Sequence, residues 1–261
     1  MPNSSVYASW SQERLWIGDW QRALHHRISR EPRRVVVLQA PGDSANICDT
    51  APEFELEGIA VPAKARSVTI DSSNQRNPGH YCVTFQLDSP FSLELKTFFH
   101  VGSGPIVRFK YQLLSKVPVH LTKTLKSDHL EYYTLNLLSA PKATEIRLSE
   151  FIETIHSFSL TECSITQEQW ENSDALMGPL LACEQSETSL ILGYEHGSQA
   201  PDAFLKYHLS PQHEVALRAT KGNYYHGQKV DELRPFESIW FQLGANEGGL
   251  RSLAKSIATS F

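Results

Sequence analysis

The feature that most limits what this chain can fold into is a long series of short, β-prone runs. Val, Ile, Phe, Tyr and Thr dominate these runs, and Pro, Gly, Asn and Asp fill the gaps, a pattern typical of strands joined by turns. In residues 81–87, apolar side chains occupy the odd positions while Thr84 and Gln86 lie between them, as in a strand with one wet face. The expected strands are residues 34–39, 54–59, 67–70, 81–87, 91–99, 106–114, 132–138, 189–194, 203–209, 215–219 and 238–243.

Two segments carry apolar residues at helical spacing instead. In the first, Leu148, Phe151, Ile152 and Ile155 lie at i, i+3, i+4 and i+7, although Ile146 alternating with Leu148 leaves a strand open there. The second is the clearest helix, predicted over residues 250–258 and opened by residues 246–249. No Gly, Asn or Pro follows it as a stop signal, so the chain is expected to end at a helix that leads elsewhere or docks on the sheet.

Many strands and few helices favour a mainly β fold, a large antiparallel β-sandwich with a few short helices and a C-terminal helix. The chain has 261 residues, of which 41% are hydrophobic, enough to bury a sizeable core in one unit. No repeat or strong change of composition divides it. We therefore expect one β-sandwich domain over residues 1–245, followed by a helix within residues 246–261.

Charge and composition exclude several functions. Twenty-four Lys and Arg against 29 Asp and Glu give a net charge of −5, so no basic field favours nucleic acid. Apolar runs such as residues 35–38 are far shorter than the roughly 20 residues that cross a bilayer. The first thirty residues lack the pattern of a secretory signal, which predicts a cytoplasmic protein. Its four cysteines form no CxxC pair and are expected to be buried free thiols.

One polar loop stands out as a candidate binding element. Residues 193–204 lie between two expected strands, and loops on a rigid sheet commonly carry binding groups. Alternatively, Gly197 and Pro201 only make the turn, and the polar side chains cap or solvate it. The residues with donors and acceptors suited to sugar hydroxyls are Glu195, His196, Gln199 and Asp202.

A second candidate lies in residues 221–227. Asn223, Tyr224 and Tyr225 combine an amide with two aromatic rings, a composition that suits stacking on pyranose faces with hydrogen bonds at the rim. Tyrosines in a core or an interface explain this cluster equally well. We predict carbohydrate contact at both clusters.

No motif assigns a catalytic residue, a metal or a cofactor. His25 and His26 are adjacent and project in different directions, and the HExxH, GxSxG, Walker and Rossmann patterns are absent from the sequence. The expectation is therefore no catalytic residue, no metal and no cofactor.

Three stretches resemble the N-terminal region of α-galactosidase-like glycoside hydrolases of family 36. They are residues 194–204, residues 221–224 and residues 237–244, and the likeness extends back through residues 178–184. Upstream of residue 140 it is one of β-rich texture only. The resemblance implies an N-terminal β-supersandwich of the galactose-mutarotase type, a central (β/α)₈ barrel with two catalytic aspartates, and a C-terminal β domain.

A (β/α)₈ barrel needs about 250 residues by itself, so the resemblance implies that the catalytic pair is missing here. The leading hypothesis is a non-catalytic N-terminal portion, either a truncated product or a fragment, which shapes the substrate pocket through the loop from Glu195 to Asp202. Its partners would be the missing barrel or a second copy, with an exposed hydrophobic patch along the barrel-facing side. Residues 246–261 would begin the helix that links it to the barrel.

Two other hypotheses remain open. A free-standing carbohydrate-binding or protein-interaction β-sandwich would expose Tyr224, Tyr225 and Trp240 as a platform. A mutarotase-like enzyme would use His196 with Glu195 or Asp202 as acid and base.

Overall fold

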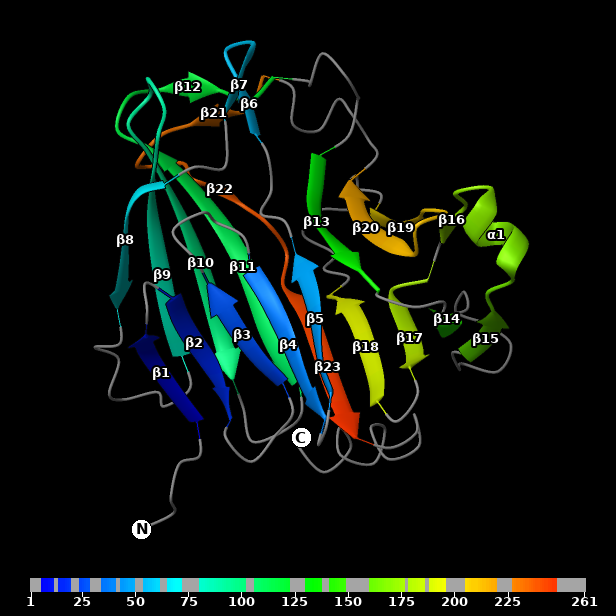
Figure 1. Ribbon diagram of the computed structural model, residues 1–261. Helices are drawn as coiled ribbons and strands as arrows, with labels where there is room; N and C mark the ends of the chain where they lie inside the picture. The colour runs from blue at the N-terminus through cyan, green and yellow to red at the C-terminus, as the bar shows by residue number, and fades with distance from the viewer. Residues whose placement is uncertain are drawn as a thin grey trace, which may run out of the picture.

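Two stacked antiparallel sheets make up most of the computed structural model (Figure 1). It describes residues 6–11, 14–19, 24–28, 34–40, 43–49, 54–61, 65–71, 80–101, 106–122, 130–137, 141–148, 160–176, 178–185, 188–195, 205–219 and 227–247. The predicted mainly β, antiparallel sandwich is confirmed.

One sheet has nine strands and contains the N-terminal part of the chain. Its strands, in spatial order, are β1 (Val6–Ser11), β2 (Arg14–Asp19), β3 (Leu24–Ile28), β4 (Arg34–Ala40), β5 (Asp43–Asp49), β13 (Leu130–Asn136), β20 (Glu214–Ala219), β19 (Leu205–Leu209) and β16 (Ala175–Leu176). Consecutive strands β1 to β5 form hairpins, and β5 then meets β13. Of these strands, β1, β2, β3, β5 and β16 were not predicted.

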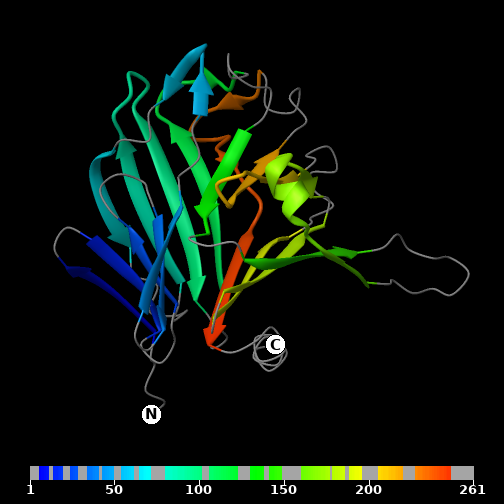
Figure 2. The ribbon, with the colours of Figure 1, turned by 45° about the vertical axis from the view of Figure 1, so that its right-hand side comes forward.

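The second sheet has ten strands, nine of them on its main path. In spatial order they are β15 (Leu160–Ser164), β14 (Lys142–Leu148), β17 (Leu180–Gln185), β18 (Thr188–Tyr194), β23 (Phe241–Glu247), β11 (Ile106–Ser115), β10 (Leu93–Val101), β9 (His80–Leu87) and β8 (Ala65–Asp71), with β22 (Phe236–Glu237) also paired to β11. The last described strand, β23, thus joins β18 to β11 in the middle of the sheet. The β14–β15 hairpin projects from the body in Figure 2.

Two short ribbons cover one end of the sandwich (Figure 1). One pairs β6 (Phe54–Leu56) with β7 (Ile59–Val61), and the other pairs β12 (Val119–His120) with β21 (Lys229–Val230). The single strand predicted over residues 54–59 is therefore wrong. Glu57 and Gly58 have φ of 51° and 76°, and this left-handed backbone reverses the chain after Leu56.

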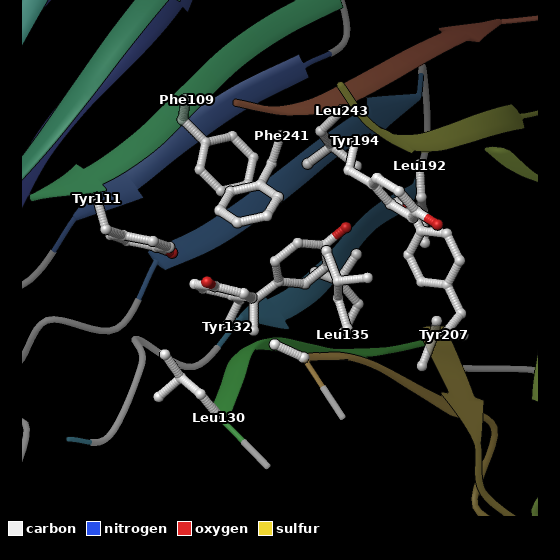
Figure 3. Packing of buried hydrophobic residues seen from close by; sticks show 14 of the residues in the cluster. Phe109, Tyr111, Leu130, Tyr132, Leu135, Leu192, Tyr194, Tyr207, Phe241 and Leu243 are labelled. Atoms are coloured by element: carbon white, nitrogen blue, oxygen red, sulfur yellow. The ribbon is translucent and has the colours of Figure 1, made fainter. Parts of the chain in front are cut away.

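An aromatic cluster joins the two sheets (Figure 3). Phe241 on β23 lies with its ring centroid 5.0 Å from that of Tyr132 and 5.6 Å from that of Tyr133, both on β13 of the other sheet. Phe109 on β11 lies 5.3 Å from Phe241. Alternation explains this core, because every second residue is buried, and its neighbours partly exposed, over residues 82–87 of β9, 93–100 of β10 and 108–115 of β11.

The one described helix, α1, spans Gln167–Glu171 and was not predicted. Thr166 caps it, because its side chain accepts a hydrogen bond from the Gln169 N–H and the Gln169 side chain accepts one from the Thr166 N–H. The ambiguous segment around Leu148 is a strand as far as β14 extends, and residues 149–159 lie outside the described residues. The helix predicted over residues 250–258 also lies outside them; β23 runs to Glu247.

Within the described ranges no helix is long and apolar enough to cross a membrane.

The cysteines differ from one another in burial. Cys183 is buried, whereas Cys82 and Cys163 are partly exposed, so the expectation of buried thiols is wrong for two of the three that can be assessed.

Candidate functional site

Glu195 is the one predicted site residue that the structure places. It directly follows β18, and because the preceding Tyr194 side chain packs in the core against Tyr207, Glu195 faces the outer surface of the ten-stranded sheet. The other predicted site residues lie outside the described residues: His196, Gln199, Asp202, Asn223, Tyr224 and Tyr225.

The Glu195 carboxylate is held by two neighbouring strands. Arg108 on β11 donates from Nε to Oε1 at 2.6 Å and places Nη2 2.5 Å from the same oxygen. Gln242 on β23 donates from Nε2 to Oε1 at 3.2 Å. The Glu195 N–H donates to the Trp240 carbonyl at 2.9 Å. Both the side chain and the backbone of Glu195 are therefore positioned, and with them the start of the loop that follows.

Strand register brings these groups together. Arg108 pairs with Gln242, and Gln242 pairs with Gly193, so all three lie in one row across the sheet. The core residues Phe109 and Phe241 are the next residues along their strands, which turns Arg108 and Gln242 to the opposite, outer face.

Trp240 lies beside this row and contacts two cations. Its ring centroid is 5.0 Å from Arg108 Cζ and 5.4 Å from Lys110 Nζ, both within cation–π range. Lys110 also lies 5.5 Å from the ring centroid of Phe98 and 3.1 Å from a carboxylate oxygen of Glu237. A face of alternating cations, carboxylates and aromatic rings results, and we call it the outer face.

This arrangement is suited to binding and positioning. Glu195 and Glu237 are each paired with a cation, and an ionised carboxylate accepts hydrogen bonds but has no proton to donate. Both ion pairs are partly exposed, so their contribution to stability is small.

A buried carboxylate on β14 binds the backbone just before β17. Glu145 on β14 is 1% exposed, accepts a hydrogen bond from the Gly178 N–H at 2.6 Å and pairs with Arg147 at 2.7 Å. Gly178 is tightly enclosed, because a Cβ there would lie 2.4 Å from the Ile146 carbonyl oxygen. Gly178 begins the 178–184 stretch, to which the likeness with the glycosidase family extends. Its hydrogen bond and close packing give it a structural role.

Burial also makes the core tyrosines poor acids. It raises the pKa of Tyr194 to about 12, with Glu145 adding to the effect, and the Tyr194 hydroxyl donates to the Leu205 carbonyl at 3.2 Å. The pKa of Tyr207 is also raised, chiefly by burial. These hydroxyls stay protonated at neutral pH.

Among the described residues no group of three or more His, Cys, Asp or Glu side chains is placed to hold a metal ion.

Sequence reasoning missed Arg108, Lys110 and Gln242. Their signal was present as polar residues at alternate positions of two predicted strands. Predicting that these residues meet Glu195 would require knowing the order of the strands in the sheet. Arg108 and Glu195, for example, are 87 positions apart in the sequence.

Comparisons with known proteins reveal similarity of fold only. No family model and no curated protein sequence match the chain. The GH36 α-galactosidase AgaB from Geobacillus stearothermophilus aligns with a TM-score of 0.60 at 8% identity, over 96% of this chain and 42% of its own. The α-N-acetylgalactosaminidase NagBb from Bifidobacterium bifidum, in a quadruple mutant, aligns with a TM-score of 0.52 at 11% identity, over 97% of this chain and 38% of its own.

A shorter protein shares the fold along nearly its whole length. The GalM/aldose epimerase homologue from C. elegans aligns with a TM-score of 0.51 at 8% identity, over 88% of this chain and 97% of its own. The chain spans less than half the length of the two glycosidases it aligns with. It has the β-sandwich fold that a GH36 α-galactosidase carries within a longer chain, in agreement with the resemblance in its sequence.

Proposed function

We propose that this chain is the non-catalytic N-terminal β-supersandwich portion of an α-galactosidase-like glycoside hydrolase. The observation that carries the proposal is the coverage: the fold aligns over 96% of this chain but only 42% of AgaB. In this proposal the groups that cleave the glycosidic bond belong to a catalytic barrel, and the sandwich positions that barrel and part of the substrate pocket. A cytoplasmic location is part of the proposal.

The contacts of Glu195 support the pocket-shaping role. Arg108, Gln242 and the Trp240 carbonyl hold the residue at which the 196–204 loop begins. A loop that starts from a fixed point on a sheet presents its side chains at a defined place. We infer that this loop, with His196, Gln199 and Asp202, walls a galactoside pocket.

Exposed apolar side chains support a domain contact at the end of the sandwich covered by the short ribbons. Ile59, Val117 and Leu233 are 49%, 48% and 92% exposed. Ile59 is on β7, Val117 precedes β12 and Leu233 follows β21, and these strands are grouped in Figure 1. Such side chains favour burial against another surface, which in this proposal is the barrel or a second copy of the chain.

A free-standing carbohydrate-binding or protein-interaction sandwich is the second candidate. The C. elegans GalM/aldose epimerase homologue favours it, because 97% of that chain aligns with this one and so the fold occurs there without a large additional domain. The ring of Trp240 contacts Arg108 and Lys110, and this contact argues against a sugar platform at Trp240. An enzyme of the mutarotase type, with His196 as acid or base, is the third.

Two measurements on the purified 261-residue chain separate these functions. Incubation with an aryl α-galactoside is expected to release no product, because the proposal assigns the catalytic carboxylates to the barrel. Turnover abolished by His196→Ala would contradict the proposal and establish an enzyme within this fold. Titration with galactosides is expected to show no saturable millimolar binding; saturable binding without turnover would establish the free-standing module.

A further inference from the structure

A second group on the outer face lies in line with the residues that hold Glu195. His80 on β9 pairs with His100 on β10, and His100 pairs with Arg108 on β11. The two imidazole rings are stacked, with centroids 4.1 Å apart and planes 15° from parallel. The three residues therefore occupy one row of register positions across three adjacent strands, with the two imidazoles in contact and Arg108 next to His100.

Within the part of the chain that the structure describes, several nitrogen atoms of these three residues have no protein acceptor. Among the described residues, neither imidazole makes a hydrogen bond, and their one described contact is with each other. Arg108 directs Nε and Nη2 at a single oxygen of Glu195, and the structure gives its Nη1 no protein acceptor within the described ranges. His80 is exposed and His100 is partly exposed, so the row is open to a ligand from solution.

The charged groups around His100 oppose its protonation. Burial lowers the pKa of His100, and the neighbouring His80 and Arg108 lower it further. Lys110 is one row farther along β11, next to Arg108 on the same face. Each of the two cations has an acidic partner, since Glu195 pairs with Arg108 and Glu237 pairs with Lys110. On β8, the backbone position of Asp71 is opposite Cys82. Positive charge exceeds negative charge at the row once the imidazoles are protonated.

We propose that the row of His80, His100 and Arg108 is a binding site for an oxyanion, such as the sulfate, phosphate or carboxylate group of a charged sugar. Protonated imidazoles and a guanidinium are donors without acceptors, and an oxyanion matches them. The bound anion removes the repulsion between the stacked rings. Because binding favours the protonated form, affinity rises as the pH falls through the titration of His100.

Inorganic sulfate is the probe, since it does not itself titrate in this range. The imidazole resonances of His80 and His100 are followed by NMR between pH 5 and 8 at constant ionic strength. Sulfate in place of chloride is expected to raise the pKa of His100 and to bind about tenfold more tightly at pH 5.5 than at pH 7.5, the gain from one charge-assisted hydrogen bond. No displacement of either set of resonances, or an equal effect of chloride, overturns the proposal.

Matched variants distinguish a built site from general attraction. His100→Asn and Arg108→Gln are expected to weaken sulfate binding about tenfold, whereas Lys110→Gln, which removes one positive charge from the same face two residues away, is expected to change it less than threefold. Equal losses in all three variants would contradict the site. If galactose 6-sulfate binds more tightly than inorganic sulfate, the natural ligand is a charged sugar. If the two affinities are equal, the site binds the free anion.

Discussion

Phe241 connects the two sheets, and replacing it tests whether the aromatic cluster holds the sandwich together. The side chain is 0% exposed and packs against rings from both sheets. Phe241→Ala leaves a cavity that those rings line. Phe98 on β10 of the same sheet is the matched control, because it is partly exposed on the outer face and its described ring contact is with Lys110.

The structure sets different magnitudes for the two changes. A buried Phe→Ala change costs about 3–5 kcal/mol of the free energy of unfolding through lost transfer energy and the remaining cavity. At Phe98 the loss is limited to part of the ring burial and a cation–π contact, about 1 kcal/mol. With a urea m-value of roughly 3 kcal/mol/M, the unfolding midpoint should fall by about 1.3 M for Phe241→Ala and by about 0.3 M for Phe98→Ala.

The assay is equilibrium unfolding in urea, followed by tryptophan fluorescence and far-UV circular dichroism on the same samples. Coincident transitions allow the midpoints to be converted into free energies. The reasoning would be refuted if both variants shifted the midpoint equally, because the Phe241 contacts across the two sheets would then contribute no more than a half-exposed ring on one face.

Two further changes test local features. Gly178→Ala is expected to lower the free energy of unfolding by about 2 kcal/mol, because the new Cβ would lie 2.4 Å from the backbone oxygen of Ile146. Gly193→Ala is the control: its Cβ would meet the flexible end of the Leu180 side chain at 2.7 Å, so it should lower the melting temperature less. A larger loss for Gly193→Ala than for Gly178→Ala would contradict this reasoning. His120→Ala is expected to raise the pKa of Glu57, which the His120 side chain and N–H lower by hydrogen bonding. The lowered pKa stabilises the fold above the ordinary value of 4.5, and that contribution is lost as the pH falls through the folded-state value; an unchanged carboxyl titration by NMR would exclude the contact in solution.

Alternation was the sequence signal that worked best, and it worked where one face of a strand is buried. Strand β9 was predicted almost to the residue, because Val83, Phe85 and Leu87 face the core and Thr84 and Gln86 do not. Helix α1 was missed although Thr166 and Gln169 form a capping box, since its span of Gln167–Glu171 is too short to develop an apolar period. Residues 54–59 were mistaken for a strand because the Glu57-Gly58 turn interrupts an otherwise apolar run.

The candidate site was accessible from the sequence only in part. Glu195 was identified from the polar loop that it opens. Its partners could not be, because Arg108 and Gln242 reach it through the order of strands β11, β23 and β18, which no local pattern encodes. The same holds for His80 and His100, whose stacking depends on the register of two strands.

The position of β23 has a consequence for synthesis on the ribosome. This strand pairs with β18 on one side and β11 on the other. The strands β8 to β11 and the strands β14, β15, β17 and β18 therefore form two separate blocks of the larger sheet until residues 241–247 emerge. During that interval β11 and β18 each present an unpaired backbone edge, which readily recruits other polypeptides. Completion of the larger sheet therefore waits for residues 241–247, and until they are synthesised the nascent chain depends on slow aggregation or on a chaperone.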